Sequence, residues 1–327
     1  MPPCTATSEV DVQLQAILLK SLLKVATTYR TVNIAQAFPT AFLKPLLSMS
    51  LAASPSVRLT VQTIFHQLLD RHKNLAKLSR PLSLASLPPG LAIEKANRHD
   101  LMFMRKHGSE ILDRILESFK IPSNTGENYD SLFTTVTLLA VELFSQEVIV
   151  EIFRVAFCLQ DTALAAVANH TMIEQQIAAL HAMVAALCSF CGQLSAIPAL
   201  QNHVEHIVKQ RHEQTPWFLP ESGHYHTLNA DNLRRRPSMT HIPEIPDELK
   251  FDKILIEEAL RSSGHDTDRL FLPFQRDTTD SVNNSGAKNR TLSDSHMNTT
   301  IDIDSVGSSP VFSRVSLTEL NLGHAFD

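Results

Sequence analysis

Cys188 and Cys191 form a Cys-x-x-Cys pair, the arrangement in the sequence that most directly suggests metal or redox chemistry. A structural zinc site needs a second pair of cysteine or histidine ligands. The pair follows Ala185, Ala186 and Leu187 in an apolar stretch, and no second cysteine pair accompanies it. Free cysteines in such surroundings act as small apolar side chains. We therefore interpret both as buried structural thiols.

His203 and His206 lie one helical turn apart, and His212 and Glu213 follow them. Imidazole nitrogens at this spacing can face the same metal ion. The chain has 15 histidines, so such pairs arise by chance, and no further ligand completes the set. We predict no metal ion and no cofactor.

The nine glycines are widely separated along the chain. The dinucleotide fingerprint, the phosphate-binding loop and the nucleophile elbow all need glycines close together, so these three motifs are absent. A catalytic triad is defined by geometry and not by sequence order, which leaves other nucleophilic arrangements open. The sequence nominates none, and we predict no catalytic residue and no enzyme.

Ser238 follows Pro237 and the basic run Arg234–Arg236 in a polar segment. A hydroxyl after a basic run is a substrate for basophilic kinases, and a phosphate there would act as a charge switch. The alternative is a solvated loop that is not modified. Both interpretations stay open.

The composition favours helices and opposes nucleic-acid binding. Hydrophobic residues make up 43% of the 327 residues but aromatic residues only 6%, a leucine- and alanine-rich balance that suits helices better than sheets. A net charge of -5 provides no overall positive field for a nucleic acid. Four cysteines are too few for a disulfide framework and indicate a reducing compartment.

Apolar residues recur at three- and four-residue steps along most of the chain, which predicts amphipathic helices. In the first of these, about 9–31, the apolar stripe contains Val10, Leu14, Ile17, Leu18, Leu22 and Val25. Further helices are expected at about 41–53, after Pro55, and at 94–119, 128–145, 147–159, 172–195, 198–214 and 247–262. None can bury its apolar face alone, so we predict an all-α solenoid of the armadillo or HEAT type.

Breaks in this rhythm divide the chain into six parts. Prolines and a glycine interrupt the pattern before residue 94, and Ser, Thr, Asn and Asp dominate the stretch after Phe274. The expected parts are helical repeats at 1–72, a loop at 73–93, helical repeats at 94–220, a polar linker at 221–246, a terminal helix with its extension at 247–274, and a disordered tail at 275–327.

The stretch from Gln175 to Val204 contains no formal charge and is long enough for a transmembrane helix. It also contains His181, Gln193 and Pro198, and the flanking residues provide no positive anchor. We favour a buried inner helix.

Short blocks spread from about Leu14 to Phe274 resemble the eighty-five-requiring-three family, also called rolling blackout. They occur in the order found in that family. The blocks are Phe42–Leu47, Asp70–Leu78, Phe103–Gly108, Leu138–Val148, Leu159–Asp161, Ile197–Ala199, Thr215–Glu221 and Ser263–Phe274.

This resemblance implies a rod of armadillo and HEAT-like repeats without catalytic residues. Such proteins lie on the cytoplasmic face of the plasma membrane and recruit a phosphatidylinositol 4-kinase through a tetratricopeptide-repeat scaffold subunit. The family reaches the membrane through a palmitoylated N-terminal cysteine cluster and basic residues. The first residues of this chain resemble the middle of a family member, and Cys4 is a lone cysteine, so we expect peripheral, indirect membrane association or a cytosolic chain.

The terminal helix and its extension are the expected contact surface for this partner. The candidates are Phe251, Leu255, Leu260, Arg269, Leu270, Leu272 and Phe274. The alternative is that these residues only cap the last repeat, since terminal repeats need capping. Two other functions stay open: a cytosolic helical-repeat adaptor with unrelated cargo, and an integral-membrane, lipase-like protein.

Overall fold

The structure is a computed structural model and describes residues 9–79, 83–220 and 245–274. The described residues contain helices, with only isolated bridges between extended residues. The helices are α1 (Glu9–Thr28), α2 (Ile34–Ala37), α3 (Thr40–Met49), α4 (Pro55–Leu69), α5 (Leu75–Leu78), α6 (Arg98–Phe119), α7 (Gly126–Glu142), α8 (Gln146–Asn169), α9 (Glu174–Ser195), α10 (Pro198–Gln214) and α12 (Lys253–Ser262), with 3-10 turns η1 (Pro216–Phe218) and η2 (Asp247–Leu249).

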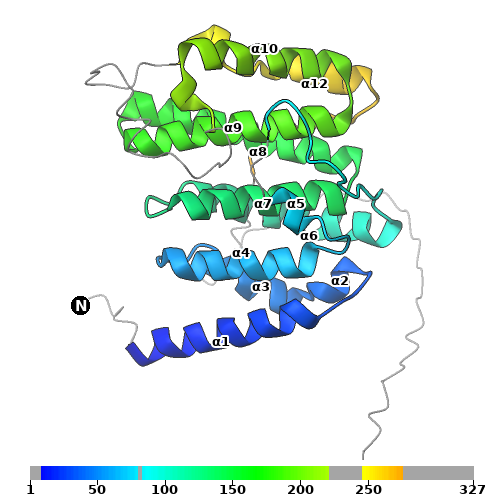
Figure 1. Cartoon of the computed structure of the whole chain (residues 1–327), viewed down its shortest axis with the longest axis vertical. Coiled ribbons are helices and arrows are strands. Elements are labelled where there is room, and N and C mark those ends of the chain that lie inside the picture. Colours follow the sequence, from blue (N-terminus) through cyan, green and yellow to red (C-terminus); the bar gives the residue numbers. More distant parts are fainter. Residues whose placement is uncertain (1–8, 80–82, 221–244, 275–327) are drawn as a thin grey trace, which may run out of the picture. The chain divides into compact units, whose positions relative to one another are not determined.

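Successive helices lie side by side in a stack (Figure 1). One row runs α1, α4, α7, α9, α10 and α12, and each helix of this row contacts the next. A second row consists of α2 with α3, then α6, then α8, and it packs against the first. Paired rows of helices that contact only near neighbours define an armadillo or HEAT-like solenoid, which confirms the predicted fold class.

Local sequence signals fix where the helices begin. The side chains of Asn97, Thr125, Ser145 and Asp252 each accept a hydrogen bond from a backbone N–H in the first turn of the helix that follows. These caps satisfy donors that have no partner within the helix. Pro55 begins α4, where its missing N–H costs nothing.

The core is densest around α7, α8 and α9. Every residue of α9 from Gln176 to Gly192 is buried. Among the described residues, α9 is long and apolar enough to cross a membrane, but 94% of its most apolar window is buried inside the stack. One such helix is weak support for a membrane span, and this burial agrees with our interpretation of an inner helix.

Several details differ from the sequence prediction. The helix expected at 247–262 begins only at Lys253, after the 3-10 turn Asp247–Leu249. The 73–93 segment contains a helical turn, α5, whose Leu78 is buried. Helix α6 begins at Arg98 and not at residue 94, because Asn97 caps it. Helix α8 continues to Asn169, ten residues beyond the predicted end at 159, because buried Ala163 and Ala166 extend its apolar face.

Candidate interaction site

A fully buried carboxylate, Glu142 at the end of α7, gathers polar side chains from the segment after α4. Its Oε2 lies 2.7 Å from His72 Nδ1, and its Oε1 accepts a hydrogen bond from Asn74 Nδ2 at 2.8 Å. Arg71 Nε lies 3.6 Å from Oε2. A buried charge with several polar partners is costly to disturb, because loss of one partner leaves the others without compensation.

Arg71 extends this cluster to two other parts of the stack. Its Nη1 donates to Asp100 Oδ2 at 3.0 Å, and to the carbonyl oxygen of Val32 at 3.0 Å. Its Nη2 donates to the backbone carbonyl of Glu142. The Asp70–Leu78 block therefore joins the α1–α2 connection, α6 and α7. These contacts of Arg71 hold the stack together.

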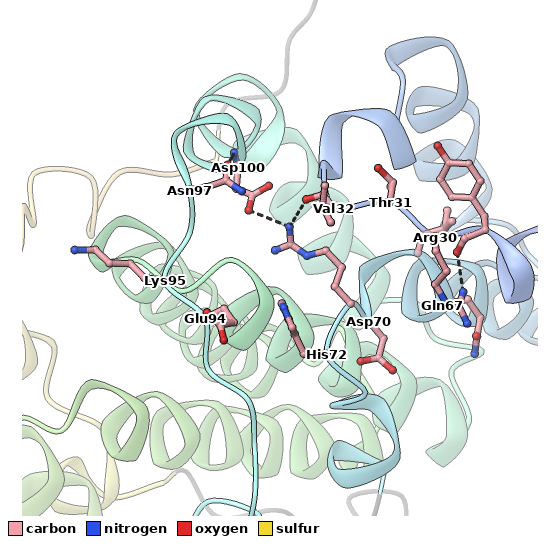
Figure 2. A pocket seen from close by; sticks show the side chains of 13 residues that line it. Arg30, Thr31, Val32, Gln67, Asp70, His72, Glu94, Lys95, Asn97 and Asp100 are labelled. Carbon is pink, nitrogen blue, oxygen red and sulfur yellow. Dashed lines mark hydrogen bonds and ion pairs between the residues drawn. The ribbon is translucent and has the colours of Figure 1, made fainter. Parts of the chain in front are cut away.

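An open pocket of about 660 Å³ lies over this junction (Figure 2). Its lining mixes cations and anions, with Glu94 and Lys95 close together at one side and Asp100 above them in the view. The deep pair of Arg71 and Asp100 is already joined by an ion pair. The described lining residues include no cysteine or serine.

The two thiols of the Cys-x-x-Cys pair are fully buried on α9. Burial raises the pKa of Cys188 to about 12 and raises the pKa of Cys191 well above its usual range. A thiol that stays protonated is neither a nucleophile nor a metal ligand. This agrees with the interpretation of structural thiols.

The histidines of α10 also have a structural setting. His203 Nε2 accepts a hydrogen bond from the backbone N–H of Asp252 at 3.2 Å, which joins α10 to the start of α12. In the part of the chain that the structure describes, no group of three or more His, Cys, Asp and Glu side chains is arranged to hold a metal ion.

Three of the predicted partner contacts are buried, which corrects that part of the prediction. Phe251, Leu260 and Leu270 are at most 1% exposed. Phe251 is fixed by Gln160 of α8, whose side chain bonds both its N–H and its carbonyl at 3.0 and 3.1 Å. These residues seal α12 and its extension onto the stack and are not available to a partner.

A buried arginine that the sequence analysis missed completes this seal. Arg211 is fully buried, its guanidinium lies 4.6 Å from the centre of the Phe251 ring, and its Nε donates to the carbonyl of Leu249 at 2.8 Å. A signal was present: Leu200, Val204 and Ile207 mark the buried stripe of α10, and Arg211 continues it at the helical spacing.

Three of the other candidates remain accessible. Leu255 on α12 is 48% exposed and Leu272 on the extension 53%, and the side chain of Arg269 is 54% exposed although its Nε lies 3.2 Å from Glu151. Phe274 is partly buried under Arg154. Ser238 lies outside the described residues.

The apolar stripe predicted for the first helix faces away from the stack, apart from Val10, whose side chain lies outside the described part of the chain. Leu14, Ile17, Leu18, Leu22 and Val25 are 39–61% exposed. The residues that α1 buries are Leu19 and Ala26, with Leu23 partly buried. Helix α1 is therefore apolar on two faces, and only one of them is covered by described residues.

Comparison with known proteins gives one consistent family. Residues 4–261 match the model of the EFR3 armadillo repeat. The chain is 35% identical over 274 residues to EFR3 homolog A of Xenopus laevis, which covers 82% of this chain and 32% of the relative. It is 35% identical over 309 residues to EFR3 homolog of Caenorhabditis elegans, and this match covers 90% of this chain and 34% of the relative. It is 32% identical over 322 residues to EFR3 homolog cmp44E of Drosophila melanogaster, and this match covers 95% of this chain and 37% of the relative.

The chain thus spans about a third of the length of the curated relatives it matches. No solved structure matches it. The family model covers nearly all of the described helices, and the two-row stack is what an armadillo repeat requires. On these grounds, the chain belongs to the EFR3 family.

Proposed function

We propose that this chain is a non-catalytic scaffold that helps to localise a phosphatidylinositol 4-kinase complex at the plasma membrane through protein contacts, and so contributes to phosphoinositide synthesis. The observation that carries the proposal is the match of residues 4–261 to the EFR3 armadillo repeat. The proposed partners are the kinase and its tetratricopeptide-repeat subunit. In this proposal the chain associates with the membrane peripherally, through its contacts with these two proteins.

The character of the stack supports a scaffold. Its charged clusters hold helices together: Glu142 serves the α4–α7 junction, and Arg154 and Arg211 fix the last helix and its extension. A solenoid offers a long surface of rigid helices, which suits the binding of another protein. The thiols of Cys188 and Cys191 are buried in the core, and His203 joins α10 to the start of α12.

The accessible end of the stack offers a candidate contact surface. Ile254, Leu255, Phe271 and Leu272 are exposed apolar side chains on α12 and its extension, and Arg269 adds a charge beside them. Exposed apolar residues with an arginine among them resemble the central part of a protein interface. We assign the kinase-complex contact to this surface.

A pull-down with purified components tests the proposal. The 327-residue chain is immobilised and offered the kinase together with its tetratricopeptide-repeat subunit, and retention of both is expected. The double substitution Leu255→Asp and Leu272→Asp should abolish retention, because it places carboxylates in the apolar contact. Met102→Asp, at an exposed apolar residue of α6, should retain both proteins.

Circular dichroism confirms that each variant is helical before binding is compared. If the folded wild-type chain retains neither protein, the recruiting role is wrong, and a cytosolic adaptor for other cargo becomes the better account. If retention survives the double substitution, the contact lies on another surface of the stack and the assignment to α12 and its extension is wrong.

A further inference from the structure

The segment at residues 245–262 is attached to the stack by side chains that bond its backbone. Gln160 of α8 bonds both the N–H and the carbonyl of Phe251, at 3.0 and 3.1 Å. Arg211 of α10 donates from Nε to the carbonyl of Leu249 at 2.8 Å. Backbone groups are common to all sequences, so these bonds would hold another segment of the same shape equally well.

A few apolar side chains of the segment provide the rest of the attachment. Ile245, Leu249 and Phe251 are at most 2% exposed. Ile256 and Leu260 of α12 are fully buried, and α12 lies along α10 (Figure 1). A ligand for this part of the stack therefore needs a Leu-x-Phe sequence that continues as an amphipathic helix.

This segment leaves the guanidinium of Arg211 incompletely bonded. Arg211 is fully buried, and its Nη2 has no hydrogen-bond partner among the described residues. The other nitrogens donate to the carbonyls of Leu249 and His181, and the group faces the Phe251 ring. No carboxylate is among these contacts. A buried cation without an anion is costly, so the segment is not the best ligand for this surface.

Lys250 brings a second cation close to Arg211. Burial lowers the pKa of His181 to about 3, and the charges of Arg211 and Lys250 lower it further. The Nζ of Lys250 lies 2.6 Å from Asp247 Oδ1, but the Asp247 side chain is 92% exposed, so water screens this pair. A carboxylate in place of Lys250 would attract Arg211, whereas the lysine repels it.

Four residues of α8, α9 and α10 form the binding surface for the segment: Gln160, His181, His203 and Arg211. We propose that this surface is a binding site for a partner protein that carries the sequence Leu-Glu-Phe or Leu-Asp-Phe followed by an amphipathic helix. Residues 245–262 occupy the site within the chain, and they are the weaker ligand because Lys250 stands at the middle position. The carboxylate gives the partner the advantage that displacement of a tethered segment requires.

Peptide binding to a variant with a vacant surface tests the proposal. In the full chain, Leu249→Asp with Phe251→Asp removes the buried apolar side chains and releases the segment. Fluorescence anisotropy then measures the binding of labelled peptides of residues 245–262. The Lys250→Glu peptide should bind about tenfold more tightly than the native peptide, with the Lys250→Gln peptide between them. The wild-type chain should bind each peptide about tenfold more weakly, because its own segment competes.

A further substitution on α10 locates the charge that selects the peptide. Arg211→Met, added to the double variant, replaces the buried guanidinium by an apolar side chain and should give the native and Lys250→Glu peptides equal affinity. Lys209→Met removes an exposed cation from the same helix and should leave the tenfold preference in place. Circular dichroism confirms that each variant is helical.

Hydrogen exchange tests displacement without vacating the surface. In the wild-type chain, the amides of residues 249–260 should exchange through an opening that leaves α9 protected. Lys250→Glu in the full chain should slow this exchange about tenfold and leave α9 unchanged, because the carboxylate strengthens the attachment. This measurement decides the question if the double variant does not fold.

Three results would overturn the proposal. The first is equal affinity of the native and Lys250→Glu peptides, and the second is no binding of any peptide to the folded double variant. The third is exchange of residues 249–260 only together with α9, which would show that the segment is an integral part of the core. The inference does not rest on the kinase-complex proposal, whose variants change the exposed residues Leu255 and Leu272.

Discussion

The guanidinium of Arg154 on α8 lies 3.8 Å from the ring centre of Phe274, at the end of the described chain. The same group donates to the carbonyl oxygens of Leu272 at 2.7 Å and Pro273 at 2.8 Å. Arg154 is only 3% exposed. One buried side chain of the repeat core therefore fixes the extension that carries the exposed Leu272.

Arg154→Ala is expected to release this extension. The change removes two charge-assisted hydrogen bonds and the contact with the Phe274 ring, and it leaves Glu151 without its partner on α8. We expect a loss of about 2–3 kcal/mol in unfolding free energy, measured by chemical denaturation. Hydrogen exchange should rise in residues 267–274. Arg105→Ala removes an exposed ion pair with Glu147 and should leave the midpoint of chemical denaturation unchanged.

Glu142→Ala should be more damaging than any change at a surface carboxylate. It removes the carboxylate that Arg71, His72 and Asn74 share. The largely buried guanidinium of Arg71 then loses its contact with that carboxylate. The expected loss is about 3–5 kcal/mol in unfolding free energy, by analogy with other broken buried ion pairs. Glu147→Ala, at a half-exposed carboxylate, is the matched control. A loss no larger than that of the control would show that the cluster contributes little to stability.

The helices were predictable from their periodicity, but their orientation was not. In α1, Leu14, Ile17 and Leu18 on one side and Leu19 and Leu23 on the other are apolar, so the pattern does not tell which side packs on α4. Only the position of α4 decides it. The part of α9 from Gln175 to Ser195 carries no charge and was easier to interpret, because an inner helix is apolar on all sides.

The polar clusters were harder to predict than the helices. Arg71 meets the backbone of Glu142 71 positions further along the chain, and Arg154 meets Leu272 118 positions further along. Residues so far apart in the sequence cannot be paired from the spacing of nearby residues. For the same reason the sequence could not separate buried Phe251 and Leu260 from exposed Leu255 within the proposed contact surface.

The stability of the stack should fall as the pH falls below 6.5. Burial lowers the pKa of His66 to about 4 and that of His181 to about 3. The unfolded chain therefore binds more protons than the folded chain below the ordinary histidine pKa of 6.5. Stability is unaffected above that pH and decreases from 6.5 down toward the folded values, by about 1.4 kcal/mol per pH unit for each histidine.

Thermal unfolding between pH 7.5 and pH 5 measures this dependence. His181→Met keeps an uncharged side chain of similar bulk beside Phe218, so its melting temperature should fall less steeply with pH. His206→Gln changes an exposed histidine of α10 and should follow the wild type. Identical slopes for His181→Met and wild type would show that His181 does not remain neutral in the folded chain.

The thiols of Cys188 and Cys191 should resist modification for as long as the chain is folded. Both are fully buried, and burial holds their pKa values far above neutral pH, so they present almost no thiolate. Cys158 is only partly buried, and burial raises its pKa as well. Iodoacetamide followed by peptide mass spectrometry should label Cys158 before the α9 pair, and the pair only in denaturant. Rapid native labelling of Cys188 or Cys191, or their protection by added zinc, would contradict the structural role and reopen the metal-site interpretation.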